Sequence, residues 1–373
     1  MLDIARITLR EIHLRLKEPF RISSGSTQER RVLLVELEDR SGLVGWAECV
    51  AGEAPNYSAE TVDTAWLAIP KWIAPLIIGR ALQNPAALFH ELEHSIRGHL
   101  MARAAVEMAA WELWARRKGV ALAELLGGVR DHVETGISLG IQATPADLVE
   151  KALSAVQGGY RRIKVKIEPE RDIEWVAAVC EAVGSRVPVT VDANAAYGLE
   201  HTERLMRLDD LGLSMIEQPL EAGDLVRHAV LQRKLNTPLC LDESITSVDR
   251  AVDMVTLGSG RIINIKPGRV GGLTASIAIH DFAAEHGVGV WCGGMLESGI
   301  GRAHNVALAS LPNFVTPGDL SPSARYWERD IVVPEWTMAD GTLRVPADRP
   351  GMGVEVDREY VEQITVRRET LER

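Results

Sequence analysis

The sequence predicts an α/β protein in which a parallel barrel of βα units follows an N-terminal α+β segment. Short apolar runs alternate with helical patterns from about residue 136 to residue 320. Five of these runs end in a charged residue, 24 to 26 residues apart: Lys166, Asp192, Glu217, Asp242 and Lys266. One strand, loop, helix and loop fit this length. Each charge therefore falls at the C-terminal end of a strand, the rim at which barrel enzymes carry their chemistry.

The N-terminal segment, residues 1–128, predicts antiparallel strands followed by helices. Residues 5–16 alternate imperfectly between apolar and polar. Residues 31–38 form an apolar run, residues 39–42 supply a turn, and residues 43–47 are expected to form the antiparallel strand that follows it. The clearest helix runs over 101–118 and ends near a glycine, as helices often do.

The pattern changes after Gly127-Gly128, where we place the start of a barrel domain spanning 129–325. Residues 136–141 predict its first strand, and Thr144 with Pro145 predicts the start of the next helix. Further strands are expected near 163, 189, 214, 239, 262 and 288, with a weaker last run over 314–320. Residues 326–373 should pack back on the N-terminal domain. A doubly wound open sheet is the competing topology, but it would gather ligands at one switch point rather than charges at five strand ends.

The composition is that of an ordinary soluble globular protein. The chain has 373 residues, 46% hydrophobic and 25% charged, with a formal net charge of −11. The negative charge argues against nucleic acid or an anionic membrane as the main partner. No signal peptide or membrane span is visible. Four scattered cysteines without CxxC spacing predict free thiols in a reducing cytoplasm.

The three acids Asp192, Glu217 and Asp242 predict a site for a hard divalent cation. Carboxylate oxygens suit Mg²⁺, and the absence of His or Cys beside them makes zinc less favoured. Without a cation, three carboxylates on adjacent strand ends would repel one another. Asn194 either supports this site or caps the following helix. Glu243 should point to the other face if its strand continues, and either supports the site or pairs with a cation.

Lys164 and Lys166 alternate with apolar residues, so both should point into the barrel mouth. Each ammonium disfavours protonation of the other, which makes Lys166 usable as a base. Lys266 stands four strands further round the ring, on the opposite wall. Arg269 either lowers the pKa of Lys266 by its charge or forms an ordinary salt bridge.

This arrangement predicts removal of an α-proton from a carboxylate substrate through an enolate. A divalent cation stabilises the negative charge that develops. One lysine removes the proton, and the other stabilises charge or returns a proton to the opposite face. Racemisation, epimerisation and β-elimination are all candidate outcomes.

Five segments resemble the muconate-lactonizing-enzyme subgroup of the enolase superfamily. They are Lys164-Val-Lys166, Val191-Asp-Ala-Asn194, Ile216-Glu-Gln-Pro219, Leu241-Asp-Glu-Ser244 and Asn264-Ile-Lys-Pro267. This superfamily is itself a standard example of a lysine or histidine base working with Mg²⁺. The resemblance covers nearly the whole chain. It implies an N-terminal capping domain followed by a modified (β/α)7β barrel, which is a TIM-like fold.

Longer segments resemble the o-succinylbenzoate synthase / N-acylamino acid racemase family within that subgroup. They include Asn264-Ile-Lys-Pro-Gly-Arg-Val-Gly-Gly272 and Val290-Trp-Cys-Gly-Gly-Met-Leu-Glu-Ser-Gly299. The resemblance implies that Lys166 and Lys266 are the acid/base pair and that Asp192, Glu217 and Asp242 bind Mg²⁺, for which Mn²⁺ or another divalent cation can substitute. It also implies a substrate pocket lined by Ser138, Gly293, Gly294, Met295 and Leu296. The mandelate-racemase branch uses a seventh-strand histidine, and none stands in Trp291-Cys-Gly-Gly-Met295.

Two glycine- and proline-bearing loops precede the barrel, near residues 19–25 and 50–57. They are either plain surface turns or, as the resemblance implies, lids over the distal part of the substrate. Phe20 and Tyr57 would then be apolar lid contacts.

The expected function is therefore o-succinylbenzoate synthesis, a dehydration in the menaquinone pathway, or racemisation of N-succinyl and other N-acyl amino acids, or both. Dipeptide epimerisation is the alternative within the enzyme class. A binding protein that has lost catalysis is the remote alternative, which the presence of all five charged residues disfavours. We expect a small carboxylate substrate and a homo-oligomer.

Overall fold

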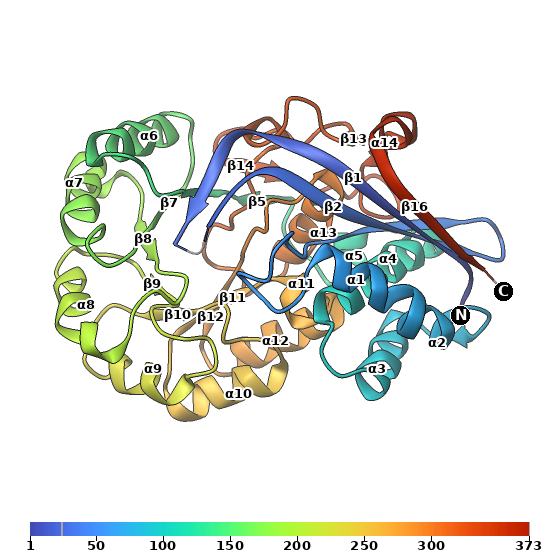
Figure 1. The fold of residues 1–373 in the computed structure, drawn as a ribbon, viewed down its shortest axis with the longest axis horizontal. Helices are drawn as coiled ribbons and strands as arrows, with labels where there is room; N and C mark the ends of the chain where they lie inside the picture. The colour runs from blue at the N-terminus through green and yellow to red at the C-terminus, as the bar shows by residue number, and fades with distance from the viewer. Residues whose placement is uncertain (24, 373) are drawn as a thin grey trace.

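The computed structural model describes residues 1–23 and 25–372. It places an N-terminal antiparallel sheet with helices beside a ring of parallel strands (Figure 1). The sheet has the order β16-β1-β2-β3, and β4 pairs with the start of β1. Its strands are β1 (Leu2–Ile22), β2 (Gly25–Asp39), β3 (Val44–Cys49), β4 (Ala81–Leu82) and β16 (Thr365–Glu372). The last of these brings the C-terminal end of the chain next to its beginning.

Helices pack on one face of this sheet. They are α1 (Val62–Ala68), a π-helical turn (Ile69–Ile73), α2 (Ala74–Ile77), α3 (Pro85–Ser95), α4 (Leu100–Lys118) and α5 (Leu122–Leu126). The predicted helix over 101–118 is therefore confirmed. At the centre of the contact, Gly45 of β3 lies against α4. A Cβ at Gly45 would come within 2.3 Å of the Ala109 carbonyl oxygen, so only glycine permits this close approach.

The second unit contains seven parallel strands in the order β12-β11-β10-β9-β8-β7-β6. They are β6 (Gly136–Leu139), β7 (Arg162–Lys166), β8 (Val189–Asp192), β9 (Ile216–Glu217), β10 (Leu239–Leu241), β11 (Ile262–Ile265) and β12 (Gly289–Cys292). The helices between and after them are α6 (Pro145–Gln157), α7 (Ile173–Val183), α8 (Thr202–Asp209), α9 (Leu225–Gln232), α10 (Val248–Leu257), α11 (Pro267–Val270), α12 (Leu273–Glu285) and α13 (Gly299–Ala309). Thr144 caps α6 as predicted, with Pro145 in its first turn.

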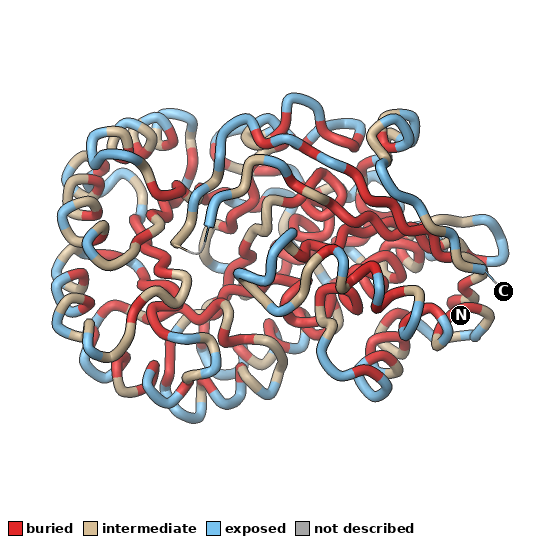
Figure 2. The backbone as a smooth tube through the Cα atoms, in the orientation of Figure 1, coloured by how far each residue is buried: buried red, intermediate tan, exposed pale blue. Residues whose placement is uncertain are grey.

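The weak apolar run 314–320 closes the ring. Phe314 bridges Val290 of β12, and Gly318 bridges Thr135 next to β6, both in parallel orientation. These single bridges stand in place of an eighth full strand. The seven parallel strands and their helices therefore form the predicted barrel rather than an open sheet. Figure 2 shows the buried backbone running along the strands, while the outer faces of α6 to α10 are exposed.

The rest of the chain forms short elements. β5 (His132–Glu134) pairs with β14 (Thr342–Arg344), and β13 (Val332–Val333) pairs with β15 (Glu355–Val356). α14 (Arg358–Ile364) then leads into β16. Within the described part of the chain, 3₁₀ turns lie at Gly184–Arg186, Leu199–His201 and Ser323–Arg325. No helix among the described residues is long and apolar enough to span a bilayer. The division into 1–128, 129–325 and 326–373 stays a prediction.

The expected loop over 19–25 is wrong in detail. β1 continues to Ile22 and pairs with β2 through Phe20 with Thr27 and Ile22 with Gly25, so residues 19–22 are strand. Position 24 lies outside the described residues. The strands persist because the hairpin is long and its end is held by the barrel: the Ile141 amide donates to the Arg21 carbonyl at 2.9 Å. Residues 50–57 do form a loop, between β3 and α1.

Candidate active site

The five charged residues lie at the C-terminal ends of neighbouring barrel strands, as the spacing predicted. Lys166, Asp192 and Glu217 are the last residues of β7, β8 and β9, while Asp242 and Lys266 directly follow β10 and β11. Lys166 is in register with Asp192, and Asp192 with Glu217. The alternation along β7 also holds, because Lys164 and Lys166 both reach Oδ2 of Asp192, at 3.2 and 2.5 Å.

Each lysine is held by carboxylates. The Lys164 ammonium lies 3.0 Å from Glu217 and 2.8 Å from Asp319. The Lys166 ammonium donates to Asn194 Oδ1 at 2.7 Å. On the other side, Lys266 lies 2.7 Å from Asp242 Oδ2. These positive charges fix the orientation of the acids.

Burial and neighbouring charges shift the pKa values of the three acids in different directions. Burial opposes ionisation of Asp192, yet the charges of Lys166 and Lys164 hold its pKa well below the usual range. Lys266 and Arg269 likewise overcome burial and lower the pKa of Asp242. For Glu217, burial and the negative charge of Asp192 win and raise the pKa to about 8.

The acids fit a hard divalent cation by the chemistry of their donors. All three are buried and offer carboxylate oxygens only. As placed, no three His, Cys, Asp or Glu side chains within 1–23 and 25–372 form a group that could hold a metal ion. Instead an ammonium, that of Lys164, lies between Asp192 and Glu217. Asp192 and Glu217 therefore already stabilise a positive charge between them. The role of the three acids as metal ligands stays a prediction.

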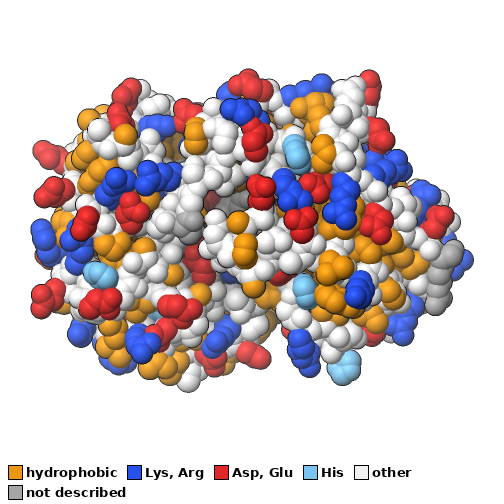
Figure 3. Space-filling model, viewed as in Figure 1, with side chains coloured by type: hydrophobic (Ala, Val, Ile, Leu, Met, Phe, Trp, Pro, Cys, Tyr) orange, Lys and Arg blue, Asp and Glu red, His pale blue; other side chains and the backbone are white. Residues whose placement is uncertain are grey.

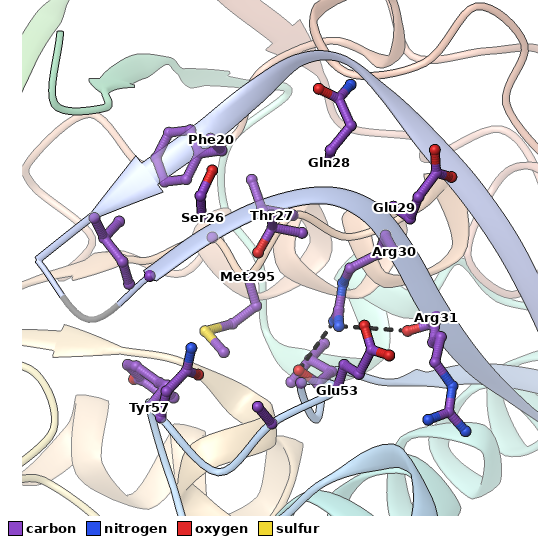
Figure 4. Close-up of a pocket in the computed structure, with 18 of the residues that line it drawn as sticks. Phe20, Ser26, Thr27, Gln28, Glu29, Arg30, Arg31, Glu53, Tyr57 and Met295 are labelled. Carbon is purple, nitrogen blue, oxygen red and sulfur yellow. Dashed lines mark hydrogen bonds between the residues drawn. The ribbon is translucent and has the colours of Figure 1, made fainter. Parts of the chain in front are cut away.

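A cavity of about 410 Å³ opens above this cluster. Lys166, Asn194 and Lys266 line its floor, and Gly294, Met295 and Leu296 line it from the segment after β12. Phe20 and Tyr57 line it from the N-terminal domain, as expected of the two predicted lid segments. Figure 3 shows the hollow between the N-terminal sheet and the barrel, and Figure 4 shows the side chains around it.

Tyr57 is more than an apolar contact. Its hydroxyl donates to Asp242 Oδ1 at 3.0 Å and accepts from the Lys266 ammonium at 3.2 Å. Arg269 also reaches this hydroxyl, at 3.3 Å, and forms an ion pair with Asp242. Both interpretations of Arg269 apply: it forms a salt bridge with Asp242, and its charge also acts to lower the pKa of Lys266. Burial disfavours the charged form of Lys266, but Asp242, Tyr57 and Glu243 together outweigh it and raise the lysine's pKa above the ordinary value.

Three predicted residues, Glu243, Gly293 and Ser138, do not line the cavity, and Asn194, which does, connects Glu243 to its floor. Asn194 adopts a positive φ of 43° and donates to Glu243 at 3.0 Å. Glu243 therefore faces the site. The expectation that it points away holds only if its strand continues, and β10 ends at Leu241, so the alternation ends there. Gly293 lies where a Cβ would come within 2.2 Å of Asn264 and 2.7 Å of the Lys266 side chain. Ser138 has a buried hydroxyl without a partner among the described residues.

Sequence reasoning missed the residues beneath the floor. Asp319 pairs with Lys164 and with Arg162, both at 2.8 Å. Trp291 lies under the same two cations, with its ring centroid 4.2 Å from the Arg162 guanidinium and 4.7 Å from the Lys164 ammonium. Asn264 donates to Glu217 at 2.7 Å. The Gly318-Asp319 pair after the weak last strand was the available signal for Asp319, at a strand end like the other acids.

The chain is similar to proteins of known family and structure. Residues 4–127 match the family model described as "Mandelate racemase / muconate lactonizing enzyme, N-terminal domain", and residues 147–361 match "Enolase C-terminal domain-like". An o-succinylbenzoate synthase of Geobacillus stearothermophilus is 50% identical, over 98% of this chain and 96% of the relative. An N-succinylamino acid racemase of Thermus thermophilus is 45% identical, over 96% of each chain. The structure of an enolase superfamily member from Listeria innocua superposes with a TM-score of 0.96 at 37% identity, over 100% of both chains.

Proposed function

The chain belongs to the mandelate racemase / muconate lactonizing enzyme family of the enolase superfamily, and we propose that it is an o-succinylbenzoate synthase, an N-succinylamino acid racemase, or both. It is an enzyme that acts on a small molecule, a lyase or an isomerase by these relatives. The two activities share one step, removal of a proton from the carbon next to a carboxylate. The observation that carries the proposal is that Lys166 and Lys266 line one cavity from β7 and from the end of β11.

The two lysines are assigned the proton transfers. Lys166 takes the α-proton from one face of the substrate, and Lys266 lies on the wall formed four strands further round the ring. In racemisation the second lysine delivers a proton to the opposite face. In the dehydration one lysine serves as acid and base, and the other stabilises negative charge. Asn194 and Tyr57 orient the two ammonium groups through the hydrogen bonds described above.

Members of this family depend on a divalent metal, and we assign its ligands here to Asp192, Glu217 and Asp242. Mg²⁺ is the cation we propose, with Mn²⁺ or another divalent ion able to substitute, because the donors are all carboxylate oxygens. When bound, the cation supplies electrostatic stabilisation for the charge that develops on the substrate carboxylate. Arg269 and Asn264 hold two of these carboxylates in place from behind.

The cavity encloses the substrate from two sides. The hairpin end and the 50–57 loop cover the floor from the N-terminal domain, so substrate contacts come from both units. We propose that these segments act as lids and that the acyl part of the substrate lies against Phe20 and Met295. We further propose that the protein works in the cytoplasm, where its four free cysteines would stay reduced, and that it forms a homo-oligomer.

A parallel assay tests this function. The purified protein with Mg²⁺ is given the dehydration substrate of the menaquinone pathway, a panel of N-succinyl amino acids, and a dipeptide. We expect turnover of the first two classes at rates far above that of the dipeptide. Preferred turnover of the dipeptide would favour the epimerase alternative, and turnover of none would favour a binding protein.

A further inference from the structure

Arg30 is a buried cation in the wall of the cavity. It belongs to β2, is 6% exposed, and lines the same cavity as Lys166 and Lys266. Its Nη1 donates to the Ala51 carbonyl at 2.9 Å and its Nη2 to the Val50 carbonyl at 3.0 Å. Among residues 1–23 and 25–372, no carboxylate lies within ion-pair distance of its guanidinium.

The next residue, Arg31, provides an internal comparison. It also lines the cavity, but its guanidinium is paired with Glu11 and with Asp63, each at 2.8 Å. Figure 4 shows the two side chains diverging, with Arg30 among the lining residues and Arg31 turned away from Met295. One of two adjacent cations is thus neutralised by the protein, and the other is not.

A buried guanidinium without an anion is costly, because carbonyl dipoles satisfy hydrogen bonds but cannot supply the missing negative charge. The Arg30 charge acts on buried Glu48, yet burial dominates there and raises the pKa of Glu48 to about 7. Glu48 also commits its Oε2 to the Ser298 amide and hydroxyl, at 2.9 and 2.6 Å. The protein therefore leaves Arg30 partly uncompensated at neutral pH.

We propose that Arg30 binds the distal carboxylate of a dicarboxylate substrate while the two lysines act at its α-carbon. This rests on the proposed function, since an N-succinyl or o-succinyl group ends in a carboxylate. A guanidinium suits that group because its planar fork can donate two parallel hydrogen bonds to one carboxylate. In the close-up, Met295 projects between Tyr57, which contacts Lys266, and Arg30, so the substrate's apolar middle would pass Met295.

The test compares two substrates that differ in one charge. N-succinyl-phenylalanine and N-succinamoyl-phenylalanine have nearly the same shape, but the second ends in a neutral amide. We expect wild type to prefer the succinyl substrate in kcat/KM by about tenfold to a hundredfold, the usual effect of a hydrogen-bonded charge. Arg30→Gln should remove most of this preference through a higher KM for the succinyl substrate alone. Arg31→Gln is the matched control and should change both substrates equally.

The outcomes distinguish a role of Arg30 in binding the substrate carboxylate from a role in holding the loop. An equal fall on both substrates in Arg30→Gln would assign Arg30 to holding the Val50–Ala51 turn and would overturn the proposal. So would an unchanged preference, or an equally selective loss in Arg31→Gln. If the glutamine variant does not fold, Arg30→Lys decides, because a retained charge must preserve part of the preference. Wild-type inactivity on both substrates would overturn the racemase part of the proposed function, and Arg30 is then judged on the dehydration substrate, where Arg30→Gln but not Arg31→Gln must raise KM. An active wild type isolates the assignment of Arg30.

Discussion

The Tyr57 hydroxyl lies 3.2 Å from the Lys266 ammonium, so a loop of the N-terminal domain contacts a residue at the end of a barrel strand. The same hydroxyl donates to Asp242 at 3.0 Å. In the lid role proposed for the 50–57 loop, closing the loop would also align the lysine.

Tyr57→Phe tests this coupling. Loss of the hydroxyl removes one hydrogen bond from Lys266 and one from Asp242, and should lower kcat by about tenfold. The fall should be larger for exchange of the enantiomer whose α-proton faces Lys266. Proton exchange followed separately for each enantiomer checks this, and equal losses for the two would contradict a specific link to Lys266.

The three acids give the second prediction. Replacing Asp192, Glu217 or Asp242 with Ala should abolish Mg²⁺ binding in calorimetry and lower turnover by at least about a thousandfold. The circular dichroism spectrum should remain that of the wild type. Glu243→Gln, a neighbouring acid outside the proposed ligand set, is the control and should still bind Mg²⁺. Metal binding that survives in the Asp192 variant would contradict the assignment.

Phe20 tests the hairpin as a lid. Its ring lines the cavity near the end of β1, so Phe20→Ala should raise KM by about tenfold as apolar contact is lost, with kcat little changed. The acyl preference should shift with it. Steady-state kinetics on several N-acyl substrates provide the measurement. Unchanged kinetics on all of them would remove the lid role from this residue.

His304 predicts a pH dependence of stability. Its ring is buried between the Ile300 and Met108 carbonyls, at 3.1 and 3.2 Å, and burial lowers its pKa to about 4. The unfolded residue has a pKa near 6.5, so the unfolded state takes up a proton first as the pH falls. Its contribution is complete above pH 6.5 and is lost toward pH 4, by roughly 3 kcal/mol at most. Denaturant unfolding of wild type and His304→Gln at pH 7 and pH 4.5 should show a smaller pH effect in the variant.

The sequence predicted the barrel and its five charged strand ends because both follow from local periodicity. The position of a charged residue at the end of an apolar run can be read from the local pattern alone, without knowledge of the rest of the fold. The same reasoning failed, or left the outcome open, where tertiary contacts decide. Residues 19–22 stay in a strand because the barrel holds the end of the hairpin, and Glu243 faces the site because its strand ends early. Asp319, Trp291 and Arg30 were not found, since their partners come from distant segments.

Removal of one lysine tests the proposed pair from both sides. Lys166→Ala should abolish both dehydration and racemisation, because no other group in the proposal removes the first proton. Lys266→Ala should lower the racemisation kcat by at least about a hundredfold. Both variants should still bind Mg²⁺, which separates a missing base from a damaged metal site.

The most direct measurement is exchange of the α-proton with deuterium in the Lys266→Ala enzyme, followed by NMR for each enantiomer of one N-succinyl amino acid. If Lys166 and Lys266 serve opposite faces, exchange continues through Lys166 for one enantiomer only, and the other keeps its proton. Exchange of both enantiomers at comparable rates, or racemisation at near the wild-type kcat, would contradict the opposed-lysine mechanism.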